Sequence, residues 1–435
     1  MPKIGAVSLG CDKNRVDTEN MLAYFSEAGW IVTSDVSEAD VVVVNTCSFI
    51  GDAKKESIDA ILDIAALKQK REFRLVVTGC LPQRYGDKIA GLLPEVDLFT
   101  GIADYSALPE LIASSPKERV CIRGCDTFTE NRVLTTDYSY AYLKVSDGCD
   151  NHCTYCAIPM IRGPYRSRDM DSLVRETRTL VTTYGVKEIN LVAQDLTRYG
   201  KDLYGRYAIT ELIDKLSQTG VSWIRLLYCY PELVTDELIE AISANDKVCK
   251  YIDIPLQHIN DGVLKRMGRR SNRAQIENLI EKLRKKIPSV AIRSTFITGF
   301  PGETEEAFSE LKDFVIRAEF DYAGFFAYSA EEDTPAAGLK GRIPQRIKRQ
   351  RKTELEKVQS AITESKQKSL IGTTQRVLYQ GIDFDRQMFV GRTEKNAPDI
   401  DTVVYFKSDK PVEAGNFYDV KIVNTRKLNL TGVLK

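Results

Sequence analysis

Short apolar runs alternate with amphipathic stretches along the first part of the chain. Three of these runs, at residues 4–10, 39–47 and 73–80, are rich in β-branched residues, as in IGAVSLG, ADVVVVNTC and FRLVVTGC. Such runs are typical of parallel strands that are buried on both faces. Between them, residues 52–69 have the periodicity of a helix with one apolar face. This alternation predicts an N-terminal doubly wound α/β domain over residues 1–120.

Each of these three predicted strands ends at or near a cysteine. Cys11 follows the first strand, while Cys47 and Cys80 end the second and the third. Parallel strands bring their carboxyl ends to one edge of a sheet, and ligands of such sheets bind beyond that edge. We therefore expect the three thiols to converge there.

A second alternation of strands and helices occupies residues 139–343, after a less regular linker at 121–138. Helical patterns, including those at 171–184, 273–286 and 303–319, follow the strands in turn. The strand candidates are YAYLKVSDGC, VKEINLVAQD, VSWIRLLYCY, KYIDIPLQH, AIRSTFITGF and FDYAGFFAYS. Six β/α units predict a partial (β/α)6 barrel, whose active site is expected at the carboxyl ends of the strands.

The last part of the chain changes from helix to short strands. Pro344 opens a charged helical pattern at 344–368, near the favoured first helical position, with eight Lys or Arg against three Glu. Residues 369–435 then contain the strand candidates QRVLYQGID, QMFVGRT, TVVYFK, FYDVKIVNT and LTGVLK. These predict an all-β, OB-like barrel, a scaffold often used on nucleic acid. The fold class is therefore α/β with a small C-terminal all-β domain.

Composition narrows the class of protein. The 435 residues contain 61 Lys and Arg against 61 Asp and Glu, a balance that does not favour a dedicated nucleic-acid binder. No apolar run approaches the roughly 20 residues of a membrane span, so no membrane partner is expected. The start, MPKIGAVSLGCDKN, is interrupted by charge and predicts a strand instead of a signal peptide. We therefore expect a cytoplasmic protein whose ten cysteines are reduced, with metal-binding or catalytic roles.

The loop GCDNHCTYC follows the first strand of the predicted barrel. It contains Cys149, Cys153 and Cys156 in a C-x3-C-x2-C spacing, and thiolates suit zinc or iron–sulfur clusters. A structural zinc site needs four ligands; His152 offers one, but no second C-x2-C lies nearby. A [4Fe–4S] cluster held by three cysteines keeps one iron free to bind a substrate or cofactor. Buried cysteines without a shared role are the remaining alternative.

This loop at the mouth of a partial barrel resembles the radical S-adenosylmethionine superfamily. The resemblance implies that the three cysteines are catalytic. They hold a [4Fe–4S] cluster whose open iron binds S-adenosylmethionine, and an electron cleaves this cofactor to a 5′-deoxyadenosyl radical. Further cofactor contacts that the resemblance implies are Tyr155, near the adenine, and Thr298, Gly299 and Pro301 in the stretch TFITGFPGE. Gln194 and Asp195, which end the second barrel strand, are candidates for cofactor or substrate contact, against a purely structural role in their loop.

The other cysteine trio narrows the family. SLGCDKNRVDTE, VVNTCSF and VVTGCLPQ, around Cys11, Cys47 and Cys80, resemble the N-terminal domain of methylthiotransferases. In that family these cysteines bind a second [4Fe–4S] cluster as metal ligands, and the C-terminal strands match its TRAM domain. The resemblance implies that one S-adenosylmethionine methylates a sulfur on the N-terminal cluster and another provides the radical. Buried cysteines at strand ends are the alternative interpretation of this trio.

Within the family, several stretches resemble the branch that modifies an aspartate of ribosomal protein S12 at its β-carbon. These are SLGCDKN, SDGCDNHCTYCAIPMIRGPYRSR, LVAQDLTRYG and DIPLQHINDGVLKRMGRR. Residues 371–435 are nearly neutral, with ten Lys or Arg against eight Asp or Glu, which also disfavours a tRNA-gripping module. The implied partners are S12 or the small ribosomal subunit and an electron donor such as flavodoxin. RNA contact is possible through the TRAM domain and the basic helix, whose charges are otherwise explained as a solvated face.

Two other functions stay open at this point. One is a tRNA adenosine methylthiotransferase with the same chemistry, and the other is a zinc-stabilised RNA-binding protein without catalysis. A few polar residues have no settled role. Arg162, Arg166 and Arg168 follow the cluster loop, where a carboxylate of cofactor or substrate favours guanidinium, although surface roles fit as well. For His258, which ends the fourth strand, a structural role fits at least as well as a functional one. The residues interpreted as structural are Cys121, Cys125, Cys229 and Cys249.

Overall fold

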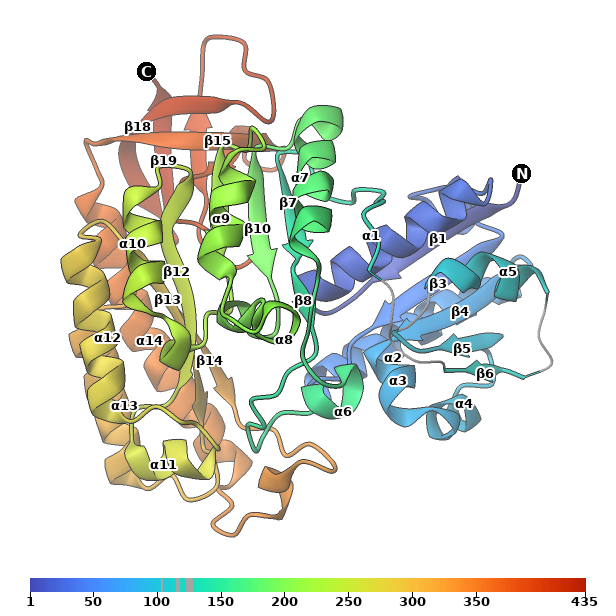
Figure 1. Ribbon diagram of the computed structural model, residues 1–435, viewed down its shortest axis with the longest axis horizontal. Coiled ribbons are helices and arrows are strands. Elements are labelled where there is room, and N and C mark those ends of the chain that lie inside the picture. Colours follow the sequence, from blue (N-terminus) through green and yellow to red (C-terminus); the bar gives the residue numbers. More distant parts are fainter. Residues whose placement is uncertain (103–104, 115–117, 123–127) are drawn as a thin grey trace. The chain divides into compact units, whose positions relative to one another are not determined.

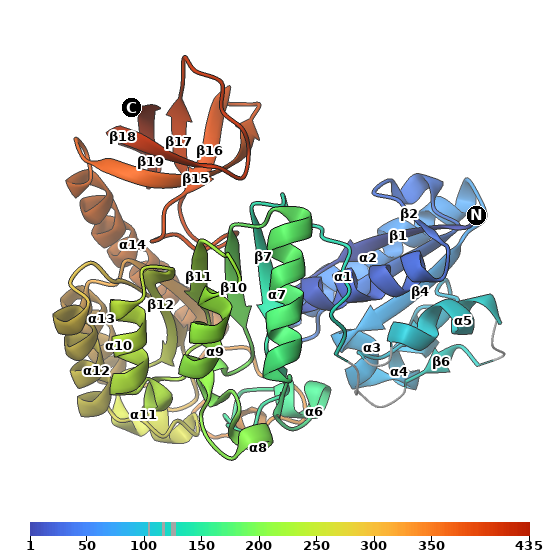
Figure 2. The ribbon, with the colours of Figure 1, turned by 45° about the horizontal axis from the view of Figure 1, so that its top comes forward.

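The computed structural model describes residues 1–102, 105–114, 118–122 and 128–435 (Figures 1 and 2). Its residues divide into two compact units. The first unit consists of residues 1–135, 147–152 and 156–168. The second consists of residues 136–146, 153–155 and 169–435. The segment with Cys149, Cys153 and Cys156 therefore contributes residues to both units.

A six-stranded parallel sheet forms the centre of the first unit, in the order β2-β1-β3-β4-β5-β6. Its strands are β1 (Lys3–Ser8), β2 (Ile31–Val32), β3 (Val41–Thr46), β4 (Arg74–Gly79), β5 (Leu98–Thr100) and β6 (Val120–Cys121). Its helices are α1 (Asp12–Glu27), α2 (Gly51–Ala66), α3 (Cys80–Tyr85), α4 (Asp87–Leu92) and α5 (Leu108–Ala113). The unit also contains α6 (Ile158–Arg162) and β9 (Arg166–Ser167).

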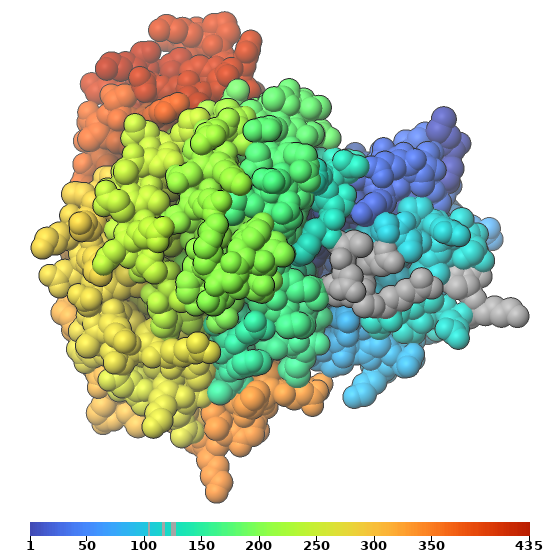
Figure 3. Space-filling model, in the orientation of Figure 1, coloured from blue at the N-terminus to red at the C-terminus, as the bar shows by residue number. Residues whose placement is uncertain are grey.

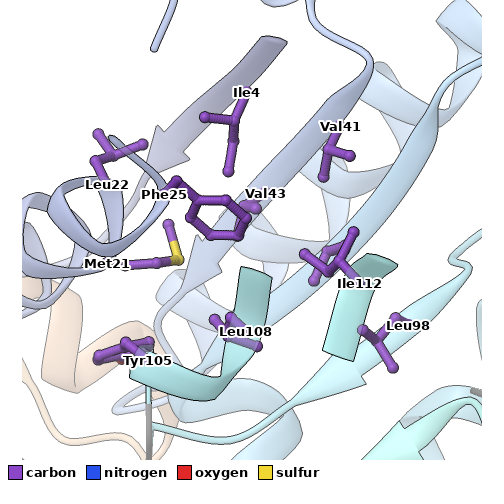
Figure 4. Packing of buried hydrophobic residues seen from close by; sticks show 11 residues of the cluster. Ile4, Met21, Leu22, Phe25, Val41, Val43, Leu98, Tyr105, Leu108 and Ile112 are labelled. Carbon is purple, nitrogen blue, oxygen red and sulfur yellow. The ribbon is translucent and has the colours of Figure 1, made fainter. Parts of the chain in front are cut away.

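Both faces of this sheet are covered, because successive side chains of a strand point to opposite sides. Val41 and Val43 of β3 pack with Met21 and Phe25 of α1 on one face (Figure 4). Val44, the next residue of β3, points to the other side and packs in the opposite cluster with side chains of α2 and α3. The apolar run in β3 therefore lies between two helical layers, and the doubly wound α/β prediction is confirmed.

The second unit contains another six-stranded parallel sheet, in the order β14-β13-β12-β11-β10-β7. Its strands are β7 (Tyr140–Lys144), β10 (Glu188–Val192), β11 (Trp223–Leu226), β12 (Val248–Gln257), β13 (Ala291–Thr298) and β14 (Tyr322–Ala327). A short strand, β8 (Ser146–Asp147), follows β7. The sheet keeps two edge strands, β7 and β14, so it is the predicted partial barrel.

Helices cover the outer face of this sheet. They are α7 (Met170–Tyr184), α9 (Ile209–Ser217), α10 (Asp236–Ala244), α12 (Arg273–Lys286) and α13 (Glu305–Ala318), while the short helices α8 (Lys201–Tyr204) and α11 (Asp261–Arg266) lie at the carboxyl end of the sheet. Figures 1 and 3 show α7, α9 and α10 side by side, with their side chains covering the strands on this face. Within the described ranges, no helix of the chain is long and apolar enough to cross a membrane.

The long helix α14 (Gln345–Ser369) runs against the edge strand β14 with an unusually polar contact face. Gln359 donates to the carbonyl of Phe320 at 2.8 Å, and Thr363 donates to that of Asp321 at 3.0 Å. The buried residues of the helix are Lys348, Arg351, Leu355, Gln359, Thr363 and Gln367. The interpretation of its basic residues as a solvated face is therefore wrong for Lys348 and Arg351, because both are buried against the partial barrel.

A closed five-stranded barrel follows, in the order β15-β16-β17-β19-β18, and confirms the predicted OB-like domain. Its strands are β15 (Thr374–Asp383), β16 (Met388–Arg392), β17 (Val404–Lys407), β18 (Phe417–Arg426) and β19 (Asn429–Leu434). This barrel packs at the amino ends of the parallel strands. Glu188, the first residue of β10, binds both Arg225 and Arg392 at 2.7 Å, and all three side chains are buried. The carboxyl ends of the parallel strands, where the cysteine loop follows β7, lie at the opposite end of the sheet.

Candidate functional site

The cysteines of the N-terminal trio follow three adjacent parallel strands of the first unit. Cys11 caps α1 shortly after β1, Cys47 follows β3 directly, and Cys80 is the first residue of α3 after β4. Since β1 pairs with β3 and β3 with β4, all three cysteines lie at one edge of the sheet. The sequence predicts this placement from strand geometry alone.

The backbone brings the Cys11 turn close to Cys47, and burial keeps the thiols of Cys47 and Cys80 protonated when no metal is bound. A Cβ on Gly10, whose φ is +89°, would lie 2.7 Å from the Cβ of Cys47, so the Cys11 turn approaches Cys47 at a glycine. Burial raises the pKa of Cys47 and raises that of Cys80 to about 12. The Arg162 guanidinium opposes this rise for Cys80, whereas the charges of Cys47 and Cys11 add to it.

Arg162 joins this edge from α6. Its guanidinium lies 3.8 Å from the sulfur of Cys80 and forms salt bridges with Asp17 at 2.9 Å and Asp147 at 3.0 Å. Burial opposes its ionisation, but Asp147 and then Asp17 outweigh burial and raise the pKa of Arg162. From the sequence, Arg162 is a candidate for binding a carboxylate of the cofactor or substrate. In the structure it is paired with two carboxylates of the protein itself.

The cysteine loop has a tight backbone on its first-unit side. The N–H of Cys149 donates to the carbonyl of Gly163 at 3.2 Å, and a Cβ on Gly148 would lie 2.0 Å from the carbonyl oxygen of Pro164. The sulfur of Cys156 accepts from the N–H of Ile158 at 3.5 Å. His152 is exposed and has a left-handed backbone, with φ of +52°.

Cys153 has two polar neighbours in the second unit. Its sulfur lies 3.4 Å from the hydroxyl of Tyr230 and 3.9 Å from the guanidinium of Arg269. Arg269 also covers the Tyr230 ring at 4.0 Å and donates to the carbonyl of Pro255 at 2.8 Å. Two groups capable of donating to a thiolate therefore lie at this cysteine.

Tyr155 packs with the stretch that the sequence associates with the cofactor. Its ring meets that of Phe300 edge to face, with 6.3 Å between centroids. Tyr155 and Ile297 border a buried cluster of Phe300 with residues of α11 and α13 and with Tyr328, which directly follows β14. The structure thus brings the loop aromatic and the TFITGFPGE stretch together.

The turn after β13 is held by one buried carboxylate. Glu303 accepts from the N–H of Gly299 at 2.8 Å and from Arg351 of α14 at 2.6 Å, and it lies 3.5 Å from Nε2 of His258. Gly299 has φ of +71°, and a Cβ there would lie 2.3 Å from Cγ of Lys348. Only glycine fits this close approach of α14 without a rearrangement.

The other residues near this turn that the sequence predicts as cofactor contacts have polar groups that already form hydrogen bonds within the protein. Thr298 is buried and donates to the carbonyl of Lys348 at 3.1 Å. The carbonyl of Pro301 accepts from Arg266 at 2.8 Å. Nδ1 of His258 accepts from the N–H of Asn260 at 3.0 Å, in a fully buried setting that agrees with the structural interpretation of this histidine.

At the end of β10, Asp195 is fully buried and accepts from the hydroxyl of Thr197 at 2.7 Å, with Arg198 at 3.8 Å. Gln194 beside it is only partly buried. Arg166 is partly buried, and Arg168 is buried and donates to the carbonyl of Thr129 at 3.3 Å.

The remaining cysteines differ in their surroundings. Cys229 and Cys249 are completely buried, and burial raises the pKa of Cys249 to about 12. Cys121 is partly exposed at the end of β6. Cys125 lies outside the described residues.

The chemistry of the donor sets fits iron–sulfur clusters. Within the described ranges, no three His, Cys, Asp or Glu side chains form a ready-made site for a single metal ion. A cubane cluster binds each cysteine through a different iron, so its ligands surround a larger group than one ion. The sequence did not indicate three polar residues that approach the cysteines, namely Tyr230, Arg269 and Asn14, nor Asp17, which pairs with Arg162. Only Tyr230 has a local indication, because it follows a parallel strand at the carboxyl end.

Three family models match the chain in succession. Residues 3–101 match the uncharacterized protein family UPF0004, residues 143–315 the radical SAM superfamily, and residues 371–434 the TRAM domain.

Curated relatives match over nearly the full length. The ribosomal protein uS12 methylthiotransferase RimO of Clostridium tetani is 47% identical over 438 residues, covering 99% of this chain and 98% of that protein. The RimO of Clostridium kluyveri is 48% identical over 440 residues, with the same coverage of both chains.

Among solved structures, the radical S-adenosylmethionine methyltransferase TsrM from Kitasatospora setae, with cobalamin and a [4Fe-4S] cluster bound, has a TM-score of 0.56. It is 14% identical, and the match covers 77% of each chain, so this likeness concerns the fold alone.

Proposed function

This chain belongs to the family of ribosomal protein uS12 methylthiotransferases RimO, within the radical SAM superfamily, and we propose that it attaches a methylthio group to an aspartate of ribosomal protein uS12. The observation that carries the proposal is the identity of 47% to a uS12 methylthiotransferase over 99% of the chain. In this reaction a C–H bond at the aspartate β-carbon is replaced by a C–S bond.

Membership of the radical SAM superfamily gives S-adenosylmethionine and a [4Fe–4S] cluster as cofactors. We infer that Cys149, Cys153 and Cys156 hold this cluster and that a second cluster is bound by the N-terminal trio. When bound, the first cluster supplies the electron that cleaves the cofactor, and the second carries the sulfur. The support for the second site is the convergence of three thiols at one sheet edge.

The chain's own residues bind and orient the reactants. Tyr155 and the turn at Gly299 and Pro301 supply an apolar wall and backbone groups for the cofactor, while Glu303 fixes that turn. The hydroxyl of Thr298 donates to a backbone carbonyl of α14, so Thr298 helps to position this helix and does not contact the cofactor through its hydroxyl. Gln194, being partly exposed, is the better candidate for direct contact than the enclosed Asp195.

We assign the sulfur-carrying site to residues 1–120 and the radical site to residues 139–343. Residues 369–435 form the TRAM domain, joined through the linker at 121–138 and the helix at 344–368. We also infer that the enzyme works in the cytoplasm on uS12 or the small ribosomal subunit. An electron donor such as flavodoxin supplies the electron. RNA contact belongs to the TRAM domain and to the exposed basic residues of the helix, such as Arg346 and Arg349. Lys348 and Arg351 are not part of this surface, because both are committed to the partial barrel.

An anaerobic assay tests this function. The reconstituted protein is given uS12, bulk tRNA, S-adenosylmethionine and a chemical reductant, and both macromolecules are then digested for mass spectrometry. A methylthio group on one uS12 aspartate is expected, with unmodified tRNA. Methylthio-adenosine in the tRNA digest would contradict the choice of substrate.

The metal content tests the chemistry independently. We expect about eight irons with matching sulfide per chain, as two cubane clusters require. Stoichiometric zinc without visible absorption would instead identify a zinc-stabilised RNA-binding protein. Neither alternative has support in the relatives, which carry the uS12 methylthiotransferase name along the whole chain.

A further inference from the structure

Arg162 is among the largest completely buried side chains of the protein, with 1% of its surface exposed. Its Nη1 donates to both oxygens of Asp147, at 3.1 and 3.0 Å. Its Nη2 donates to Asp17 at 2.9 Å and to Oδ1 of Asn14 at 2.5 Å, and lies 3.8 Å from the sulfur of Cys80. A buried guanidinium that is paired on both nitrogens is fixed in position, because every displacement breaks a charge-assisted bond.

These partners come from three separate parts of the first unit. Arg162 ends α6, six residues after Cys156, and Asp147 lies two residues before Cys149. Asn14 and Asp17 belong to α1, which begins just after Cys11. One guanidinium therefore ties the chain on both sides of the cysteine loop to the edge that holds the N-terminal trio.

The amide of Asn14 decides which group donates to the sulfur. Its Nδ2 donates to the carbonyls of Leu9 and Thr46, at 3.1 and 2.9 Å, so its Oδ1 is the atom that faces Arg162 and Cys80. Oδ1 can only accept. Once Cys80 is a thiolate ligand it has no proton to give, and Arg162 is then the group that donates to its sulfur.

Apolar packing supports the same connection. Ala157 and Ile161 of the α6 segment form a buried cluster with Cys80 and Ile102. Cys80 is thus held on one side by aliphatic groups and approached on the other by a permanent cation.

We propose that Arg162 is a positioning residue, which fastens the loop of Cys149 and Cys156 to Cys80 and so keeps the sulfur-carrying site in register with the radical loop. This inference rests on the proposed function, but it concerns a residue that neither cofactor chemistry nor the relatives' names assign. The expected consequence of losing Arg162 is an uncoupled enzyme. Cofactor cleavage continues, while sulfur delivery fails and the N-terminal cluster becomes labile.

The first test isolates the N-terminal site and does not use activity. In a background with Cys149, Cys153 and Cys156 changed to Ala, the protein is reconstituted anaerobically, and the rate of iron loss to a chelator is measured. Arg162→Gln is expected to lose iron at least about tenfold faster, since groups that support metal ligands typically contribute 10–100-fold in affinity. Arg162→Lys keeps the positive charge but loses the two-pronged guanidinium, so its rate of iron loss should lie between those of the parent and of Arg162→Gln.

The matched control is Arg178→Gln, which removes an exposed arginine of α7. It should lose iron at the parental rate. Because Arg162→Gln leaves Asp17 and Asp147 buried without their cation, a combined variant, Arg162→Gln with Asp17→Asn and Asp147→Asn, removes this penalty. Circular dichroism melts confirm that the variants compared are folded. Parental iron retention in the folded combined variant would overturn the proposal.

The second test uses the chain with all its cysteines and measures 5′-deoxyadenosine and methylthio-aspartate in the same reaction. The ratio of product to 5′-deoxyadenosine is expected to fall about tenfold in Arg162→Lys and in the combined variant. An unchanged ratio would refute the positioning role. If the unmodified enzyme makes no methylthio-aspartate, the proposed function fails, while the iron-loss comparison still judges Arg162.

Discussion

The hydroxyl of Tyr230 lies 3.4 Å from the sulfur of Cys153. The guanidinium of Arg269 stacks on the tyrosine ring, 4.0 Å from its centre. Burial raises the pKa of Tyr230 well above its usual range, with Arg269 opposing this effect. The hydroxyl therefore keeps its proton at every working pH. Next to a cysteine thiolate it is a hydrogen-bond donor, as is the guanidinium of Arg269.

Tyr230→Phe is predicted to lower the midpoint potential of the cluster proposed at Cys153. A donor at the sulfur stabilises the added electron, and hydrogen bonds to the sulfurs are among the factors that set such potentials. Losing about 1 kcal/mol corresponds to about 40 mV for one electron. A redox titration followed by electron paramagnetic resonance measures the shift.

The control for this variant is Tyr328→Phe. Tyr328 is a buried tyrosine near the same loop, packed on Phe300, and its hydroxyl has no hydrogen-bond partner in the part of the chain that the structure describes. Its potential should equal that of the parent. Equal shifts in both variants would mean that the hydroxyl at Cys153 has no specific effect.

The two cysteine trios are predicted to fail in different ways. Cys153→Ala should abolish cleavage of S-adenosylmethionine, because the open iron that binds the cofactor is lost. Cys47→Ala should retain cleavage but stop sulfur insertion. Each variant should keep about four irons, the content of one cubane cluster. Chromatography of 5′-deoxyadenosine and mass spectrometry of uS12 separate the two outcomes, and normal sulfur transfer by both variants would contradict the two-cluster proposal.

The sequence predicts those features of the site that follow from regular geometry. Cys11, Cys47 and Cys80 could be placed at one edge because consecutive parallel strands align their carboxyl ends. The loop of Cys149 could be placed at the barrel mouth for the same reason. In both cases the apolar pattern locates the strand and the strand locates the thiol.

Contacts between distant polar residues could not be predicted in this way. Arg162 and Asp17 are separated by 145 positions, and no local pattern connects a guanidinium to its buried carboxylate. The contact face of α14 was missed because Gln359, Thr363 and Lys348 are polar yet buried. A hydrophobic periodicity identifies the inner face of a helix only when that face is apolar.

Glu303→Gln is predicted to weaken cofactor binding more than turnover. Glu303 fixes the N–H of Gly299 and is bound by Arg351, and the neutral amide loses the charged partner. Charged hydrogen bonds contribute about 1.5–3 kcal/mol, so KM for S-adenosylmethionine should rise at least about tenfold. Steady-state kinetics of cofactor cleavage, with kcat and KM separated, measure the effect.

Glu305→Gln serves as the comparison. Glu305 binds the other terminal nitrogen of Arg351 at 2.8 Å, but its side chain is 77% exposed. Solvent screens that pair, so KM should be unchanged. A similar rise in KM for both variants would locate the effect in α14 as a whole and not in the turn at Gly299.

Glu188→Gln is predicted to loosen the C-terminal barrel. Glu188 is completely buried between Arg225 and Arg392; burial alone would raise its pKa, but the two arginines outweigh burial and lower it below 4.5. A depressed carboxyl pKa stabilises the fold fully above pH 4.5, and this stabilisation is lost as the pH falls through the folded-state value. Breaking a buried ion pair costs about 3–5 kcal/mol. Urea denaturation at pH 7 should therefore show a large loss in the free energy of unfolding for Glu188→Gln, and this loss should narrow at acid pH.

The control is Glu211→Gln, in the exposed pair with Arg206. It should change the free energy of unfolding by no more than about 0.5 kcal/mol. Equal losses in both variants, or a Glu188→Gln loss that does not diminish at acid pH, would contradict this role of Glu188.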